Sequence, residues 1–225
     1  MRPAAGPRRA ALAALLPALL LLGACAPGRQ ALRGEEARTA SEFFAACANV
    51  AFPVVASYTA SAEVRGKTVP LVAGVKAQAP GLETLGVYDP LGRAILFLDN
   101  EGGAVRVSRG PAAAEYPDAG LERVPPEGAR FRSEGFSFGR VLAGAPGFPV
   151  AGGEPSRAKD GAWVLADGPQ TLFSDPSRRH LSRAEYEISG RRVAVSYPGR
   201  AGSGPPGTIA IEVRGAKMTL RRDVE

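Results

Sequence analysis

The residues that could perform chemistry in this chain are few, and their spacing matches no common catalytic pattern. His180 is the only histidine among the 225 residues, so a Ser-His or Cys-His site would have to use it. Neither Gly-x-Ser-x-Gly nor His-Glu-x-x-His occurs in the chain, which argues against a serine hydrolase or a zinc protease. Asp118, Asp160 and Asp175 lie in turns that contain Pro or Gly, where aspartate commonly binds backbone N–H groups. We therefore expect no enzyme, no metal site and no dissociable cofactor.

Cys25 is the remaining reactive candidate, and it follows a segment with the parts of a signal peptide. Three arginines lie among the first nine residues, and the run 10–22 is apolar apart from Pro17. This run is shorter than the roughly 20 residues that a membrane-spanning helix needs. We expect an exported chain whose signal is removed. The alternative is an ordinary secretory signal with a cysteine near its end by chance.

The four residues Leu22-Gly23-Ala24-Cys25 resemble the lipobox of bacterial lipoproteins. The resemblance implies cleavage before Cys25 and covalent attachment of a diacylglycerol and an N-acyl chain to that residue. Two or more acyl chains anchor a protein stably, since each buried methylene contributes about 0.8 kcal/mol. Ala26 stands where, by resemblance to the enterobacterial sorting rule, Asp would favour the inner membrane. The expected location is therefore the outer membrane, with the protein lipid-anchored and facing the periplasm.

The domain organisation follows from that cleavage site. We predict a signal peptide at residues 1–24, a lipid anchor and tether at 25–34, and one lipid-binding domain at 35–225. The formal charge of +6 falls to about +3 when the signal arginines are removed, and the remaining basic residues are scattered. Nucleic acid is not an expected partner, although a weak attraction to anionic headgroups is compatible with this charge. If Cys25 is lipidated, Cys47 has no disulfide partner, and we expect it to be a small buried apolar residue.

The periodicity of apolar residues changes along the chain. Residues 35–48 have the 3.6-residue spacing of an amphipathic helix. From Ala56 onward apolar and polar residues alternate with a period of two, which is typical of half-buried antiparallel strands. The segment 110–161 interrupts this pattern with Pro and Gly and contains one expected short helix at 136–143. Strands are expected at 56–65, 69–78, 82–88, 94–98, 104–109, 163–166, 170–173, 183–189, 193–197, 208–213 and 216–221.

These elements amount to roughly nine to eleven strands and two or three short helices. One sheet of this length with one apolar face must close into a barrel or be covered. The helices are too few and short to cover it completely. We predict a mainly β fold: a single antiparallel, incompletely closed β-barrel, or half-barrel, with short helices covering the concave face.

Four segments, in order, resemble LolB, the outer-membrane lipoprotein receptor, and its LolA relatives. They are the strand and turn 85–92, the short helix and Gly-x-Pro of 138–147, the strand pair 181–197 and the terminal hairpin 209–220. The family's aromatic residue beside the helix leucine and its terminal tryptophan are missing. The resemblance implies a half-barrel that accepts the acyl chains of lipoproteins from a periplasmic lipoprotein carrier. It also implies insertion of those lipoproteins into the outer membrane.

The apolar residues of the strands and the short helix are the candidates for an acyl-chain cavity. The same residue types would also fill a solid core, so their identity does not separate the two arrangements. Two other functions therefore stay open: a carrier of free lipid or another apolar ligand, and a non-enzymatic scaffold or assembly lipoprotein with a filled core. The candidates are Tyr58, Leu85, Val87, Leu96, Leu98, Phe138, Leu142, Trp163, Tyr186, Ile188, Ile209 and Ile211.

The turn Asp89-Pro90-Leu91-Gly92 places an apolar side chain where turns usually face water. Pro90 suits position i+1 of a β-turn, so Leu91 occupies position i+2. One interpretation is that Leu91 folds back onto the barrel rim. The other comes from the family resemblance, in which this leucine is a membrane-insertion probe. Burying one leucine contributes only about 1.5–3 kcal/mol, which could bias a transfer step but could not anchor a protein.

Overall fold

The structure is a computed structural model that describes residues 29–116, 124–125, 128–132, 135–200 and 204–223. The signal peptide, Cys25 and Asp118 lie outside the described residues. Among those described, no helix is both long enough and apolar enough to cross a membrane. The strands are β1 (Gln30–Ala31), β2 (Val54–Val64), β3 (Lys67–Ala79), β4 (Leu82–Tyr88), β5 (Ala94–Glu101), β6 (Ala104–Arg109), β7 (Ala129–Arg132), β8 (Glu154–Arg157), β9 (Trp163–Asp167), β10 (Gln170–Ser174), β11 (Leu181–Ile188), β12 (Arg191–Ser196), β13 (Thr208–Val213) and β14 (Ala216–Arg222).

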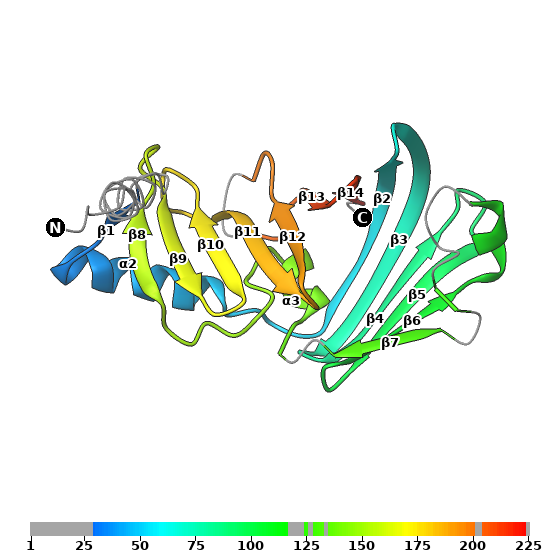
Figure 1. Cartoon of the computed structure of the whole chain (residues 1–225), viewed down its shortest axis with the longest axis horizontal. Helices are drawn as coiled ribbons and strands as arrows, with labels where there is room; N and C mark the ends of the chain where they lie inside the picture. Colours follow the sequence, from blue (N-terminus) through cyan, green and yellow to red (C-terminus); the bar gives the residue numbers. More distant parts are fainter. Residues whose placement is uncertain (1–28, 117–123, 126–127, 133–134, 201–203, 224–225) are drawn as a thin grey trace, which may run out of the picture.

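In the described part of the chain these strands form one antiparallel sheet of 14 strands, in the order β1-β8-β9-β10-β11-β12-β13-β14-β2-β3-β4-β5-β6-β7. The chain thus builds two meanders, β2 to β7 and β8 to β14, which are joined where β14 pairs with β2 (Figure 1). The outermost strands β1 and β7 do not pair with each other, so the sheet is open. The prediction of a mainly β, incompletely closed antiparallel barrel is confirmed.

The alternating sequence pattern identified every long strand and missed three short ones. In β2, Tyr58 and Ala60 are buried while Ser57 and Thr59 are exposed, as a period of two requires. The missed strands β1, β7 and β8 have only two to four residues each. Segments this short do not contain enough residues to display a period. They were assigned to the tether and to the Pro- and Gly-rich segment.

Helix α2 (Gly34–Cys47) begins and ends one residue before the expected range and covers the β8–β9 part of the sheet. Phe44 on its apolar side is fully buried, and the ring of Phe43 meets that of Trp163 edge to face at 5.7 Å. On the polar side, the carboxylate of Glu36 accepts a 3.3 Å hydrogen bond from Trp163 Nε1 and pairs with Arg157. Apolar packing and a charged contact therefore hold α2 on this part of the sheet.

Helix α3 (Phe138–Leu142) is only five residues long. It lies near the middle of the molecule (Figure 1) and contacts β3. In the described part of the chain, a 3-10 helix, η2 (Pro111–Glu115), follows β6. These short elements leave much of the concave face of the sheet uncovered by helix.

Candidate functional site

The concave face contains an apolar cavity of about 600 Å³. Strands β3 to β5 and β7 form one wall, β11 to β14 form the other, and α3 lies at the end between them. Only Ser189 and Arg191 contribute polar side chains to its lining. The lining residues are Ala73, Leu85, Val87, Leu96, Leu98, Phe131, Phe136, Phe138, Val141, Leu142, Ile188, Ser189, Arg191, Val193, Val195, Ile211, Val213, Met218 and Leu220.

A second cavity of about 430 Å³ adjoins the first. It is also lined by the parts of β2 and β3 nearest the turn that joins them, and by Ile95 and Tyr116. Each cavity has a volume within the range of about 300–1,000 Å³ typical of small-molecule sites. The two are continuous along the sheet, because Val87, Leu96, Ile211, Val213 and Met218 line both.

The structure brings most of the sequence candidates together on this surface. Those that line the cavities are Leu85, Val87, Leu96, Leu98, Phe138, Leu142, Ile188 and Ile211. The other four candidates, Tyr58, Trp163, Tyr186 and Ile209, lie in the packed core and do not line either cavity. Trp163 is covered by α2, and the two tyrosines support α3.

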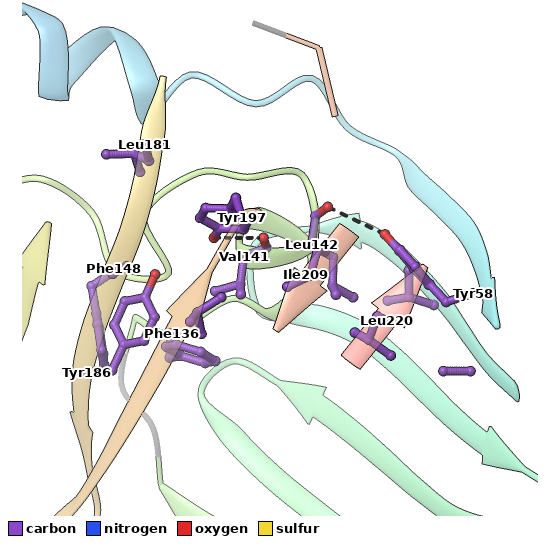
Figure 2. Close-up of a cluster of buried hydrophobic side chains, with 14 of the residues drawn as sticks. Tyr58, Phe136, Val141, Leu142, Phe148, Leu181, Tyr186, Tyr197, Ile209 and Leu220 are labelled. Carbon is purple, nitrogen blue, oxygen red and sulfur yellow. Dashed lines mark hydrogen bonds between the residues drawn. The ribbon is translucent and has the colours of Figure 1, made fainter. Parts of the chain in front are cut away.

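The tyrosines act as supports because their hydroxyl groups bind the backbone around α3. Tyr58 donates to the carbonyl of Leu142 at 3.4 Å, and Tyr197 donates to that of Val141 at 3.0 Å (Figure 2). The hydroxyl of Tyr186 accepts the backbone N–H of Gly147 at 3.0 Å. Burial raises the pKa of all three tyrosines, so the hydroxyls remain neutral. They fix the end of the cavity in place.

A buried carboxylate that the sequence analysis did not single out also fixes α3. Glu83 on β4 is 3% exposed and accepts the backbone N–H groups of Phe138 at 2.7 Å and Gly139 at 3.2 Å. The Ser137 hydroxyl donates to the same carboxylate. The sequence does contain a signal for this role. Glu83 is two residues from Leu85 and therefore lies on the same, apolar face of the strand, where a carboxylate is unusual.

Gly139 permits the close approach of α3 to β3. A Cβ atom at this position would lie 2.6 Å from Cβ of Ala77, which no real packing tolerates. The carboxylate of Glu83 and the missing side chain of Gly139 therefore act together to seat the helix on the sheet. The end of the cavity at α3 is closed by a rigid element.

The turn after β4 is built as predicted. The N–H of Gly92 donates to the carbonyl of Asp89 at 2.9 Å, and Asp89 Oδ1 accepts the N–H groups of Leu91 at 2.9 Å and Arg93 at 2.8 Å. Burial opposes ionisation of Asp89, but the hydrogen bonds from Arg93 lower its pKa. Leu91 at the tip is 80% exposed. The side chain points into water and does not pack on the barrel rim.

The other reactive candidates have structural roles. His180 lies in the loop after β10 but is buried at 9% exposure, with Nδ1 3.8 Å from Oδ1 of Asp175. Asp175 binds the N–H groups of Arg179 and His180, which makes it a turn former. Burial raises the pKa of the half-buried Cys47 thiol to about 11, so the thiol is protonated. In the described ranges, no three His, Cys, Asp or Glu side chains gather where they could hold a metal.

Comparisons with known proteins support the fold. No family model matches the chain, and no curated protein sequence matches it significantly. A LolA-superfamily protein from Nitrosomonas europaea aligns over 84% of this chain and 91% of its own, with a TM-score of 0.50 and 13% identity. At that identity the similarity is one of fold.

Two further solved structures align less closely. A DUF1329 family protein from Desulfovibrio piger covers 84% of this chain and 92% of its own, with a TM-score of 0.47 and 9% identity. A candidate outer membrane lipoprotein-sorting protein domain from Vibrio parahaemolyticus covers 84% and 91%, with a TM-score of 0.45 and 9% identity.

Proposed function

We propose that this protein is a non-enzymatic lipoprotein that binds acyl chains in the apolar cavities of its open sheet. The observation that carries the proposal is the pair of adjoining cavities, about 600 and 430 Å³, whose linings are almost entirely apolar. An acyl chain of 16 carbons has an apolar transfer energy of about 12 kcal/mol at about 0.8 kcal/mol per methylene. Such a chain needs a protein cover to cross an aqueous compartment.

The more specific proposal is that the bound chains belong to lipoproteins, which a periplasmic carrier delivers and this protein inserts into the outer membrane. The similarity of fold to a LolA-superfamily protein supports an acyl-chain ligand. Leu91 supports the insertion step, because it is 80% exposed at the tip of a rigid turn. A carrier of free lipid is the alternative that the same cavities favour.

Lipid co-purification separates these functions. Mass spectrometry of protein purified from its own host is expected to find acylated peptides or intact lipoproteins. Phospholipid alone would favour the carrier of free lipid. Absence of any lipid from protein that also fails to bind a fluorescent fatty-acid analogue would contradict acyl-chain binding and favour the scaffold.

The membrane anchor is part of the same proposal and depends on Cys25. The thiol of Cys25 is the group to which the diacylglycerol would be attached, so the Cys25→Ala variant is expected to lose all labelling by radioactive palmitate. The matched variant Cys47→Ala should retain the label, because Cys47 lies in α2, outside the Leu22-Gly23-Ala24-Cys25 sequence. Undiminished label on Cys25→Ala would exclude this anchor.

A further inference from the structure

Four hairpins have their turns at the same end of the strands. In sheet order they are β11–β12, β13–β14, β2–β3 and β4–β5, and the last turn is set back, because β4 ends at Tyr88 opposite Val72, in the middle of β3. The pairs Val213↔Ala216, Ala216↔Val64 and Val64↔Lys67 place the turns of β13–β14 and β2–β3 at the same edge. Adjacent hairpins are about 10 Å apart, because neighbouring strands are about 4.8 Å apart.

Three of these turns carry an exposed arginine. Arg191 directly follows the β11–β12 turn, Arg214 lies in the β13–β14 turn, and Arg65 lies in the β2–β3 turn. The sheet turns between these hairpins: the β2–β3 hairpin, which carries Arg65, is the uppermost in Figure 1, whereas the β11–β12 turn lies low in the middle. We call Arg65 and Arg214, whose turns are adjacent and about 10 Å apart, the arginine rim.

The backbone does not explain why arginine occupies position 65. Arg65 has a φ of +52°, in the left-handed region where hairpin turns favour Asn, Asp or Gly. An arginine there is less favourable for the turn than an asparagine. Its charge or its reach is therefore the property that distinguishes it from the residues that the turn prefers.

Other cations at this edge are neutralised by neighbouring acids. Lys217 pairs with Glu212 at 3.1 Å, and Arg192 pairs with Glu185. Among the described residues, neither rim arginine forms an ion pair, although Glu63 lies close to the same turn on β2. The rim is thus an exposed pair of unneutralised positive charges.

The cavities reach this same edge. Ser189, Arg191 and Val213 line the first cavity at the opposite end of the strands from α3, and Lys67 and Lys217 line the second. Val64, Lys67, Val213 and Ala216, which flank the turns of β2–β3 and β13–β14, line the second cavity, so Arg65 and Arg214 lie beside its open end.

We propose that the arginine rim docks on an anionic phospholipid bilayer, so that the open end of the cavities faces the headgroups. That the cavities hold an acyl chain while they face the headgroups rests on the proposed function, whereas the docking of the arginine rim on the bilayer does not. An arginine near an anionic membrane surface increases partitioning roughly fivefold, and salt screens the attraction.

Vesicle flotation tests this docking. The chain begins at residue 25 and carries Cys25→Ser, so that no acyl chain holds it on the vesicle and every described residue is retained. We expect flotation with phosphatidylcholine vesicles that contain phosphatidylglycerol, release at high salt, and no flotation with phosphatidylcholine alone. No flotation with anionic vesicles, or equal flotation with both at high salt, would overturn the proposal.

Matched double variants locate the surface. Arg65→Gln with Arg214→Gln should lower partitioning about 25-fold, at roughly fivefold for each charge. Lys159→Gln with Arg179→Gln removes the same charge from exposed positions at the opposite edge and should change partitioning less than about twofold. An equal loss of partitioning in both double variants would show that only the net charge of the protein matters and would refute docking through the arginine rim.

A second measurement separates this inference from the proposed function. Neither Arg65 nor Arg214 lines a cavity, so their double variant should bind a fluorescent fatty-acid analogue as the parent chain does. Loss of flotation with intact ligand binding supports a docking role for the rim. Anionic flotation by a parent chain that binds no fatty acid would support the docking and contradict the acyl-chain function.

Discussion

The part of the sheet beneath α2 and the part around α3 have the same alternation of apolar residues, yet one is filled and the other is hollow. Beneath α2, Leu165 and Leu172 are 1% and 0% exposed, respectively. Around α3, Leu96 and Ile211 are only partly buried and line cavities. The strands do not differ in kind, so the covering elements produce the difference.

The lengths of the two helices explain the contrast. α2 has 14 residues and supplies Phe43 and Phe44 to fill the space over its strands, whereas α3 has 5 residues and covers only one end of the concave face. A longer helix over the second region would provide the missing side chains. The cavities are therefore present because α3 is too short to fill the space over its strands. Substitutions that introduce a charge should distinguish the filled region from the hollow one.

The largest effect is expected in the filled region. Leu172→Glu puts a carboxylate at a fully buried position of β10 that has no cationic partner. The cost is several kcal/mol, comparable with the roughly 5–15 kcal/mol that stabilises a domain. Circular dichroism and thermal unfolding should show a chain that does not fold cooperatively. A variant with nearly unchanged melting would mean that the filled region is looser than its burial indicates.

The same change in the hollow region should spare the fold and abolish binding. Leu96 lines both cavities, so in Leu96→Glu the carboxylate can reach water through the cavity instead of being trapped in packed side chains. We expect circular dichroism close to that of the parent and at least a tenfold weaker affinity for a fluorescent fatty-acid analogue. The control Val55→Glu changes a residue that is 63% exposed and lies outside both cavities. Unfolding of Leu96→Glu, or parental affinity, would contradict a binding cavity.

Acid should weaken the filled region first. Burial opposes ionisation of Asp175, but hydrogen bonds from the Ser177 hydroxyl and from the His180 and Arg179 N–H groups lower its pKa from 3.8 to about 2. A lowered pKa stabilises the fold above about pH 4, and the contribution is lost as the pH falls towards 2. The difference corresponds to about 2 kcal/mol.

Fluorescence of Trp163 reports on this region, because Trp163 is the only tryptophan and lies beneath α2. The denaturant concentration at the unfolding midpoint, followed by this fluorescence, should decrease as the pH is lowered from 4 to 2. Asp175→Asn should be less stable at neutral pH and should show a flatter profile over that interval. If the variant and the parent lose stability in parallel, another carboxylate controls the acid response.

The predictability of the fold and the site differed for physical reasons. Strands long enough to alternate, such as β2, were evident, whereas β1 has two residues and no period to detect. Leu85 and Leu96 are among the apolar residues that the sequence offers as cavity candidates, and they line the cavity. Trp163 was assigned to the same surface, but the position of α2 relative to β9 is a tertiary contact that local sequence does not encode.

The smallest effect on the fold is expected at Leu91, which is exposed to water, unlike the buried leucines beneath α2. The turn depends on Asp89 and Gly92, not on the leucine, whose side chain is 80% exposed. Leu91→Glu should therefore change stability by less than about 0.5 kcal/mol, as exposed substitutions usually do, and should leave fatty-acid binding intact. The expected loss is in delivery, because a carboxylate cannot enter the bilayer as a leucine can.

Transfer of a labelled lipoprotein to liposomes measures this step. Leu82→Glu is the matched control, since Leu82 is 48% exposed at the other end of β4. Normal delivery by Leu91→Glu would exclude an insertion role, and equal loss in both variants would indicate an effect of added negative charge rather than of this turn.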